Sequence, residues 1–357
     1  MKIRLLLVAA LWVAGLCSAA LAGDTYSFGR GARGFLIREY NEKLLASVRA
    51  TAKDRAQAPK EADEFDPATE ENTRLLQATL AEPSRAASGR AGPAEFAAVG
   101  LTWPDEFTRC VNLIDCWEGT FAKLEGSSES EDTFPNVTFG IVGFTSQDGS
   151  LQEFLKEANE GSNGAIFQMA RDRLSPDEAA KFIDLIEHYR SSELKRNHES
   201  FVKLVISNPK DDPDQQKPRP EMSKLFAAFA AIPQFRDIQL SAARKKSWDH
   251  ELPDFREQMF GSFESRSLRT DLFLFDMTVL TDGPGKKAWH NLSKLAWHSE
   301  GERMNQVFAA MKASSEYKDD EDKRADILER ERCIIEGHGE VHDDDYDLRD
   351  FALIPAP

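Results

Sequence analysis

The sequence predicts a mainly helical protein with one small β element. Apolar side chains recur at helical spacing in several segments, as Leu36, Tyr40, Leu44 and Val48 do. Alternation of apolar residues is confined to one short stretch, residues 137–144, which predicts a strand. No repeat period is visible along the 357 residues, so a solenoid is not expected.

Helix start signals and apolar periodicity place most of the expected elements. Pro104 opens one helix and is followed by acidic residues that suit the positive end of the helix dipole. Ser175, which is followed by Pro176, is expected to cap another helix. Helices are expected over residues 35–48, 104–121, 151–158, 164–171, 175–189, 222–230, 235–246, 268–280, 293–311 and 320–336.

The first 22 residues resemble a secretory signal peptide. Lys2 and Arg4 flank an apolar run, and Ala20-Leu21-Ala22 suits a cleavage site. No other apolar run has the length that a bilayer span requires, so no integral membrane segment is expected after processing. A secreted or periplasmic location follows as the expectation.

The formal net charge is −16, and removal of Lys2 and Arg4 with the leader makes it more negative. Such a field repels nucleic acid and attracts polycations. An equally open interpretation is that the charge only keeps an exported protein in solution. No nucleic-acid partner is therefore expected, and a monomer is assumed.

Composition divides the mature chain into two parts. Residues 23–100 are rich in Ala, Arg, Glu and Pro. This composition predicts a low-complexity N-terminal extension or linker that carries no catalytic residues. Residues 101–357 read as the folded domain, with a surface insertion at 208–220 where proline and charge accumulate.

Cysteine and histidine usage predicts neither a disulfide framework nor a metal centre. Processing leaves three cysteines, Cys110, Cys116 and Cys333, with no repeated close spacing. His338 and His342 have metal-like spacing but lack a third ligand on a regular element. No metal and no cofactor are expected.

The most informative stretch is the helix that contains Cys116-Trp117-Glu118, together with the strand that begins near Val137. Glu118 is a polar interruption next to the apolar stripe of this helix, and Trp117 can supply an apolar wall beside it. A carboxyl group shielded in this way can retain a proton for a glycosidic oxygen. Glu118 is therefore a candidate general acid.

Four segments, in order, resemble glycoside hydrolase family 46, the chitosanases of the lysozyme-like superfamily. The similarity covers residues 108–353. Its pieces are Glu118 with Val137-Thr138-Phe139-Gly140-Ile141, Phe235-Arg236-Asp237-Ile238-Gln239 followed by Trp248, the helix 268–280 with Phe275-Asp276, and Arg324-Ala325-Asp326-Ile327-Leu328-Glu329-Arg330.

The resemblance implies a lysozyme-like fold, with two helical lobes, a small β element and a cleft between the lobes. It also implies inverting hydrolysis of chitosan, in which an acid and a base stand about 6.5–9.5 Å apart. Glu118 takes the acid's place and Thr138 would hold the attacking water. The implied substrate-binding residues are Asp148, Trp117, Arg236 and Arg324.

The implied base lies in a loop that departs from the family pattern. The family's Asp-Gly-Arg-Gly run is absent, and Asp132 is nearest in spacing, with Glu131 and Glu129 as alternatives. Two other functions stay open for this reason: a peptidoglycan muramidase of the same fold, and an exported glycan-binding protein whose catalytic loop has decayed.

Overall fold

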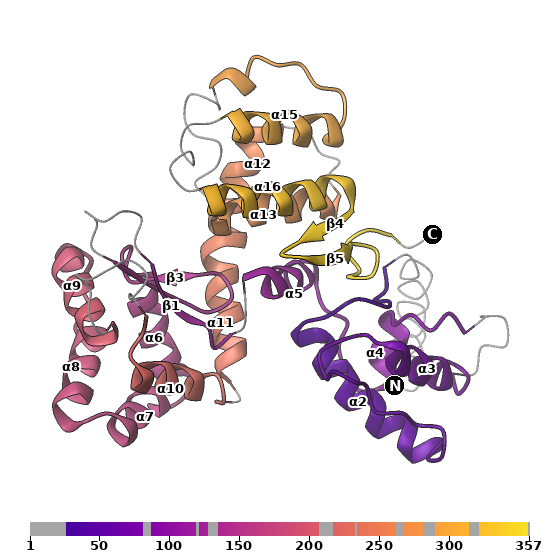
Figure 1. Cartoon of the computed structure of the whole chain (residues 1–357), viewed down its shortest axis with the longest axis horizontal. Coiled ribbons are helices and arrows are strands. Elements are labelled where there is room, and N and C mark those ends of the chain that lie inside the picture. The colour runs from indigo at the N-terminus through magenta and orange to yellow at the C-terminus, as the bar shows by residue number, and fades with distance from the viewer. Residues whose placement is uncertain are drawn as a thin grey trace, which may run out of the picture. The chain divides into compact units, whose positions relative to one another are not determined.

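The computed structural model describes residues 26–80, 87–118, 121–127, 135–206, 217–232, 234–261, 267–280, 290–313 and 321–355. The leader and the loop acids Glu129, Glu131 and Asp132 lie outside these ranges, as does most of the 208–220 insertion. The described chain is mainly helical, as predicted (Figure 1). It divides into two compact units, residues 114–251 and a discontinuous unit of residues 1–113 and 252–357.

The N-terminal part of the discontinuous unit is folded. It contains α2 (Phe35–Thr51), α3 (Pro67–Gln77) and α4 (Pro93–Ala98). Tyr40 and Phe96 stack with ring centroids 4.8 Å apart, and both are buried. Phe28 is also fully buried and forms backbone bridges to Ala91 and to Phe351, near the C-terminus.

These contacts correct the expectation that residues 23–100 form an extension or linker. Asp66 caps α3 by accepting from the Thr69 N–H at 2.8 Å, and Pro67 occupies the first turn. The Asn41 amide donates to the carbonyl groups of Ala62 and Glu64. Composition missed this part because hydrogen-bonded polar groups, which look like linker residues in sequence, form much of its interior.

The remainder of this unit is a helical layer with a C-terminal hairpin. Its elements are the start of α5 (Glu106–Glu118), α12 (Leu252–Phe260), α13 (Leu268–Leu280), α15 (Glu300–Ala313), α16 (Glu321–Glu336), and the antiparallel strands β4 (His338–Val341) and β5 (Asp344–Asp347). α13 is buried on all sides from Thr270 to Met277. It is therefore the central helix of the unit.

The second unit begins within α5 and contains a small sheet and seven helical segments of α or 3-10 type. Its strands are β1 (Leu124–Ser127), β2 (Asn136–Phe139) and β3 (Phe144–Thr145), all antiparallel in the order β1-β2-β3. Its helical segments are α6 (Ser150–Gly161), α7 (Ala165–Arg173), α8 (Pro176–Glu187), η1 (Ser191–Glu193), α9 (Leu194–Val205), α10 (Pro220–Phe229) and α11 (Phe235–Ala243), which continues into a π-helix, η3 (Arg244–Glu251).

A cluster of phenylalanines joins the sheet of this unit to its helices. Phe144 of β3 stacks on Phe154 of α6 with ring centroids 4.6 Å apart. Phe139 of β2 packs edge-on against Phe226 of α10, at 4.8 Å. Because these rings come from four elements, they fix the sheet against the helical layer.

Most expected helices are present, with shifted ends, and four differences matter. The strand expected over 137–144 is two strands, since Gly140 has a positive φ of 80° and the chain turns there. The helix expected over 235–246 becomes a π-helix at Arg244, and the one expected from Ser293 begins only at Glu300. α9 was not predicted, although it carries the buried residues Phe201 and Val205.

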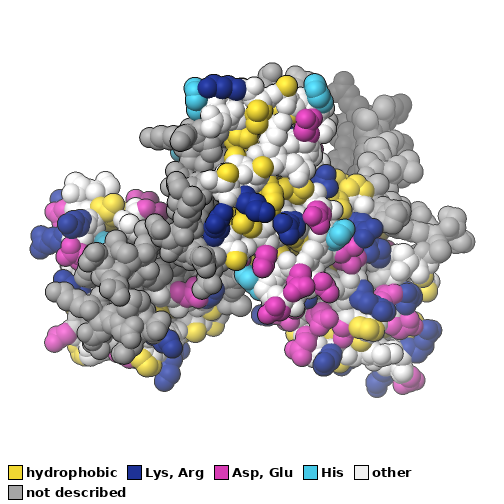
Figure 2. Space-filling view, turned by 45° about the horizontal axis from the view of Figure 1, so that its top comes forward, with side chains coloured by type: hydrophobic (Ala, Val, Ile, Leu, Met, Phe, Trp, Pro, Cys, Tyr) yellow, Lys and Arg dark blue, Asp and Glu magenta, His cyan; other side chains and the backbone are white. Residues whose placement is uncertain are grey.

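Within the described ranges, no helix has the combination of length and apolar character that a membrane crossing needs. Acidic and basic side chains are interspersed on the face that Figure 2 shows.

Candidate functional site

Glu118 is the last residue of α5, and its side chain is half-buried. The helix buries Phe107, Val111 and Ile114 along the stripe that the sequence predicted. Beyond the helix end, the Lys123 ammonium donates to the Glu118 backbone carbonyl at 2.7 Å. This bond satisfies a carbonyl group that a helix terminus leaves without an intrahelical partner.

Trp117 lies inside the protein beside Glu118, with only 4% of its surface exposed. A ring buried to this degree cannot serve as a solvent-facing platform for a sugar. It can supply the apolar wall that the sequence suggested for the neighbouring carboxyl group.

Thr138 occupies the middle of β2, which is the central strand of the sheet. Its register partners are Glu125 on β1 and Thr145 on β3, so a polar row crosses all three strands. Its neighbours in sequence, Val137 and Phe139, point to the opposite face and are buried. The strand therefore presents the Thr138 side chain on the polar face of the sheet, away from the core.

Asp148, the predicted ligand of a cationic sugar, already has protein partners. It accepts from the Thr145 hydroxyl at 2.7 Å and from the Ser150 N–H at 2.8 Å, and Lys246 of the π-helix lies 3.2 Å away. Burial raises the pKa of Asp148, but the Ser150 hydrogen bond and the Lys246 charge outweigh it, so the pKa is lowered overall. The carboxylate is ionised, and Lys246 offsets its charge.

The two predicted arginines lie in different units. Arg236 is a half-buried residue of α11, in the same unit as Glu118 and Thr138. Arg324 is on α16 in the discontinuous unit, where its guanidinium donates to the Lys312 carbonyl at the end of α15. This hydrogen bond gives Arg324 a structural role between two helices.

Gln239 is the site residue that the sequence analysis missed. It lies on α11, has no exposed surface, accepts from the Ile141 N–H at 3.1 Å and donates to the Phe121 carbonyl at 3.0 Å. A Cβ atom on Gly140 would lie 2.5 Å from the Gln239 Oε1 atom. The space beside Gly140 is therefore filled by this amide.

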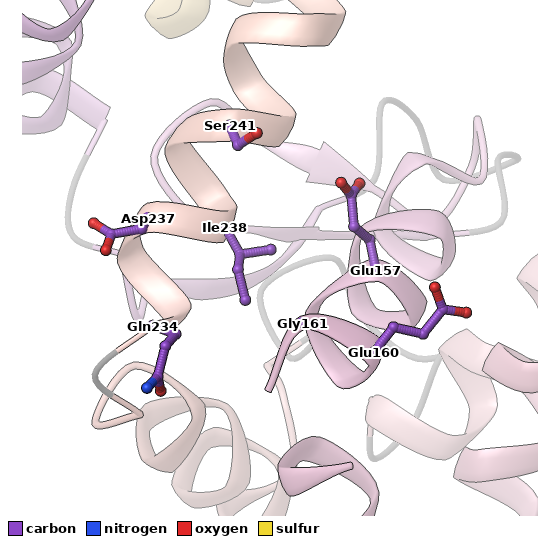
Figure 3. A pocket seen from close by; sticks show the side chains of 7 residues that line it. All are labelled: Glu157, Glu160, Gly161, Gln234, Asp237, Ile238 and Ser241. Carbon is purple, nitrogen blue, oxygen red and sulfur yellow. The ribbon is translucent and has the colours of Figure 1, made fainter. Parts of the chain in front are cut away.

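A groove of about 490 Å³ lies between α6 and α11 (Figure 3). Glu157 and Glu160 of α6 and Asp237 of α11 line it, and Ile238 lies between the two helices against Gly161. Within the described residues these three carboxylates have no ion-pair or hydrogen-bond partner. The Asp237 and Glu160 side chains point to opposite sides in Figure 3, so the acids border the groove without converging on one point.

The Arg324–Arg330 motif contributes a buried ionic cluster to the discontinuous unit. Arg330 pairs with Asp276 of α13, and both side chains are almost fully buried. Asp326 lies 3.7 Å from Arg330 and 2.6 Å from His342 of the hairpin. Arg330 and Asp276 therefore form a buried ion pair, to which Asp326 and His342 are connected at its more exposed end.

The described part of the chain contains no group of three His, Cys, Asp or Glu side chains that could hold a metal ion. Cys110 and Cys333 are buried and Cys116 is half-buried, and none of the three forms a disulfide within the described residues.

Comparisons with protein-family models, with curated proteins and with solved structures find no match for this chain. Functional inference accordingly rests on the residues described above and on the motifs of the sequence.

Proposed function

We propose that the chain is a secreted, endo-acting glycoside hydrolase that cleaves chitosan or a related amino-sugar polymer by inversion. One observation carries the proposal. Helix α5 ends at Glu118, and the sheet that follows presents Thr138 on the polar face of its middle strand. A lysozyme-like fold with a substrate cleft, and export through the N-terminal leader, belong to the same proposal.

In this proposal Glu118 protonates the leaving oxygen and Thr138 holds the attacking water. A carboxylate among Asp132, Glu131 and Glu129 would act as the base. The position of Glu118 supports the acid role, because the side chain is half-buried at the end of α5 and keeps part of its surface open to a substrate.

The charge of the protein favours a cationic polymer over an anionic one. The chain carries a formal charge of −16, and the groove between α6 and α11 is bordered by carboxylates that no described cation neutralises. Amino groups of a glucosamine polymer are attracted by such a surface, whereas an anionic cell-wall polymer is repelled.

Replacement of Glu118 by glutamine tests the proposal. Glu118→Gln preserves the shape of the side chain and removes its proton, so we expect kcat on soluble chitosan to fall by about 10²–10⁴-fold. Glu106→Gln is the matched control, since Glu106 is an exposed residue of the same helix. Reducing-end release from chitosan by the Glu118→Gln variant at the wild-type rate would refute the assignment.

A second candidate function is glycan binding without turnover. The observation that favours it is the ion pair of Asp148 with Lys246, which occupies an acid that a chitosanase would present to substrate. Zymograms on chitosan and on purified peptidoglycan, together with calorimetric titration of glucosamine oligomers, separate the possibilities. Binding without cleavage of either polymer would favour this second function, and clearing of peptidoglycan alone would favour a muramidase.

A further inference from the structure

Gln239 connects the two chain segments that follow the proposed catalytic residues. Its Nε2 atom donates to the carbonyl of Phe121, three residues after Glu118, and its Oε1 atom accepts from the N–H of Ile141, three residues after Thr138. All of these residues belong to the 114–251 unit. One buried amide thus holds both segments to α11.

The partners of Gln239 determine how its amide is oriented. A carbonyl group can only accept and a backbone N–H can only donate, so Nε2 must face Phe121 and Oε1 must face Ile141. The same two segments are joined directly where the Gly140 N–H donates to the Lys123 carbonyl at 3.0 Å. Gln239 is therefore part of a closed hydrogen-bonded unit, in which neither segment can shift without breaking a bond.

The backbone at Gly140 fits closely around the same amide. Gly140 has φ near 80°, and any Cβ atom there would lie 2.5 Å from Oε1 and 2.9 Å from Cδ of Gln239. Substitution of either residue therefore disturbs the other, which makes the pair suitable for a double-mutant test.

We propose that Gln239 is a positioning residue, which fixes the separation of the Glu118 carboxyl group and the Thr138 hydroxyl through the Phe121 and Ile141 backbones. The inference rests on the proposed hydrolase function. A misplacement of about 1 Å between reacting groups can cost about 10²-fold in rate. Gln239 thus acts on the chemical step without touching substrate.

Two substitutions test this role in the full-length protein. Gln239→Met keeps the side-chain length but removes both hydrogen bonds, and we expect kcat on glucosamine oligomers to fall about 10²-fold while KM changes by less than about threefold. Gln239→Glu keeps the acceptor for Ile141 but sets an oxygen against the Phe121 carbonyl. Its kcat, relative to wild type at the same pH, should recover as the pH is lowered and the carboxyl group gains a proton that it can donate.

Gln168→Met is the matched control, because Gln168 is an exposed glutamine of α7 in the same unit and does not line the groove, so kcat should stay unchanged. A Gln239→Met variant with wild-type kcat, or one in which only KM changes, overturns the proposal. So does a Gln239→Glu variant whose relative kcat does not vary with pH.

Amide hydrogen exchange separates this proposal from the proposed function. If the wild type does not cleave chitosan, the hydrolase proposal has failed, and the role of Gln239 in catalysis fails with it. If the wild type is active, exchange at the Ile141 amide should be faster in Gln239→Met than in wild type or in Gln168→Met. Unchanged exchange at Ile141 would overturn the positioning role while leaving the hydrolase proposal intact.

Discussion

Two buried carboxyl groups share one arginine in the discontinuous unit. Asp276 pairs with Arg330, whereas neither oxygen of Glu331 has a hydrogen-bond partner among the described residues, although the side chain is fully buried. Burial raises the pKa of Glu331 well above its ordinary value, the charge of Asp276 raises it further, and Arg330 only partly compensates. The protonated form of Glu331 is therefore favoured in the folded protein.

The raised pKa of Glu331 predicts a particular pH dependence of stability. The pKa of Glu331 is higher in the folded protein than in the unfolded chain. Its contribution to the free energy of unfolding is therefore most favourable below about pH 4.5 and is lost as the pH rises toward its folded-state pKa. The free energy of unfolding should fall by up to about 1.4 kcal/mol per pH unit over that range. Glu331→Gln should abolish this contribution, which urea unfolding at several pH values measures.

Glu329→Gln is the matched control, because Glu329 is exposed on the same helix. The difference in unfolding free energy between wild type and Glu331→Gln should grow with pH, and that between wild type and Glu329→Gln should not. A constant difference for Glu331→Gln would show that Glu331 is ionised in the folded protein.

The buried hydroxyl group of Ser146 connects helix α9 to the sheet. Ser146 Oγ accepts from the Val137 N–H at 3.1 Å, donates to Asn136 Oδ1 at 3.0 Å and lies 3.1 Å from His198 Nδ1 of α9. A hydroxyl group has one proton, so His198 is the donor in its contact with Ser146. The sheet that presents Thr138 is thereby tied to a helix that periodicity did not predict.

The environment of His198 predicts that acid loosens this attachment. Burial lowers the pKa of His198 below 6.5, against opposing effects of a hydrogen bond to the Ser146 backbone and of the Glu199 charge. As the pH falls, His198 is therefore protonated in the unfolded chain before it is protonated in the folded protein. Its contribution to the free energy of unfolding is complete above about pH 6.5 and is lost as the pH falls through its folded-state pKa. His198→Asn should reduce the loss of stability between about pH 7 and pH 5, measured by urea unfolding.

His188→Asn provides the comparison for this experiment. His188 is exposed and lies 3.0 Å from Asp184 at the end of α8. Its substitution should leave the acid-dependent loss of stability in place. An identical loss in His198→Asn and in wild type would contradict the assignment.

The chain builds one compact unit from both of its ends. Residues 26–113 pack with residues 252–355 through Phe28 and Phe351, and Arg90 pairs with Asp350 at 2.5 Å. Deletion of residues 23–100 should therefore remove part of a core. We expect the truncated protein to lose its cooperative thermal transition, as followed by circular dichroism.

A point substitution makes the same test in the full chain. Phe28→Ala should lower the free energy of unfolding by about 3–5 kcal/mol, since Phe28 is fully buried. Leu295→Ala is the control, because Leu295 is 51% exposed and should change stability by less than about 0.5 kcal/mol. A truncated protein with wild-type thermal stability would restore the linker interpretation.

Local patterns in the sequence determined the mainly helical class and most individual helices. The apolar stripe of α5, the cap of α8 at Ser175 and the periodicity of α2 depend on neighbours within a few turns, so spacing alone reveals them. Glu118 at the end of an apolar helix is a pattern of the same kind.

Only the tertiary structure decided which polar groups are buried and with which partners. Gln239 meets Ile141 from a position 98 residues away, Lys246 meets Asp148 across the same separation, and Phe28 meets Phe351 from the far end of the chain. Such pairings depend on how elements pack, and no local spacing encodes them. For the same reason residues 23–100 resembled a linker in sequence, although buried aromatic side chains and hydrogen-bonded polar ones make residues 26–80 and 87–100 part of a folded unit.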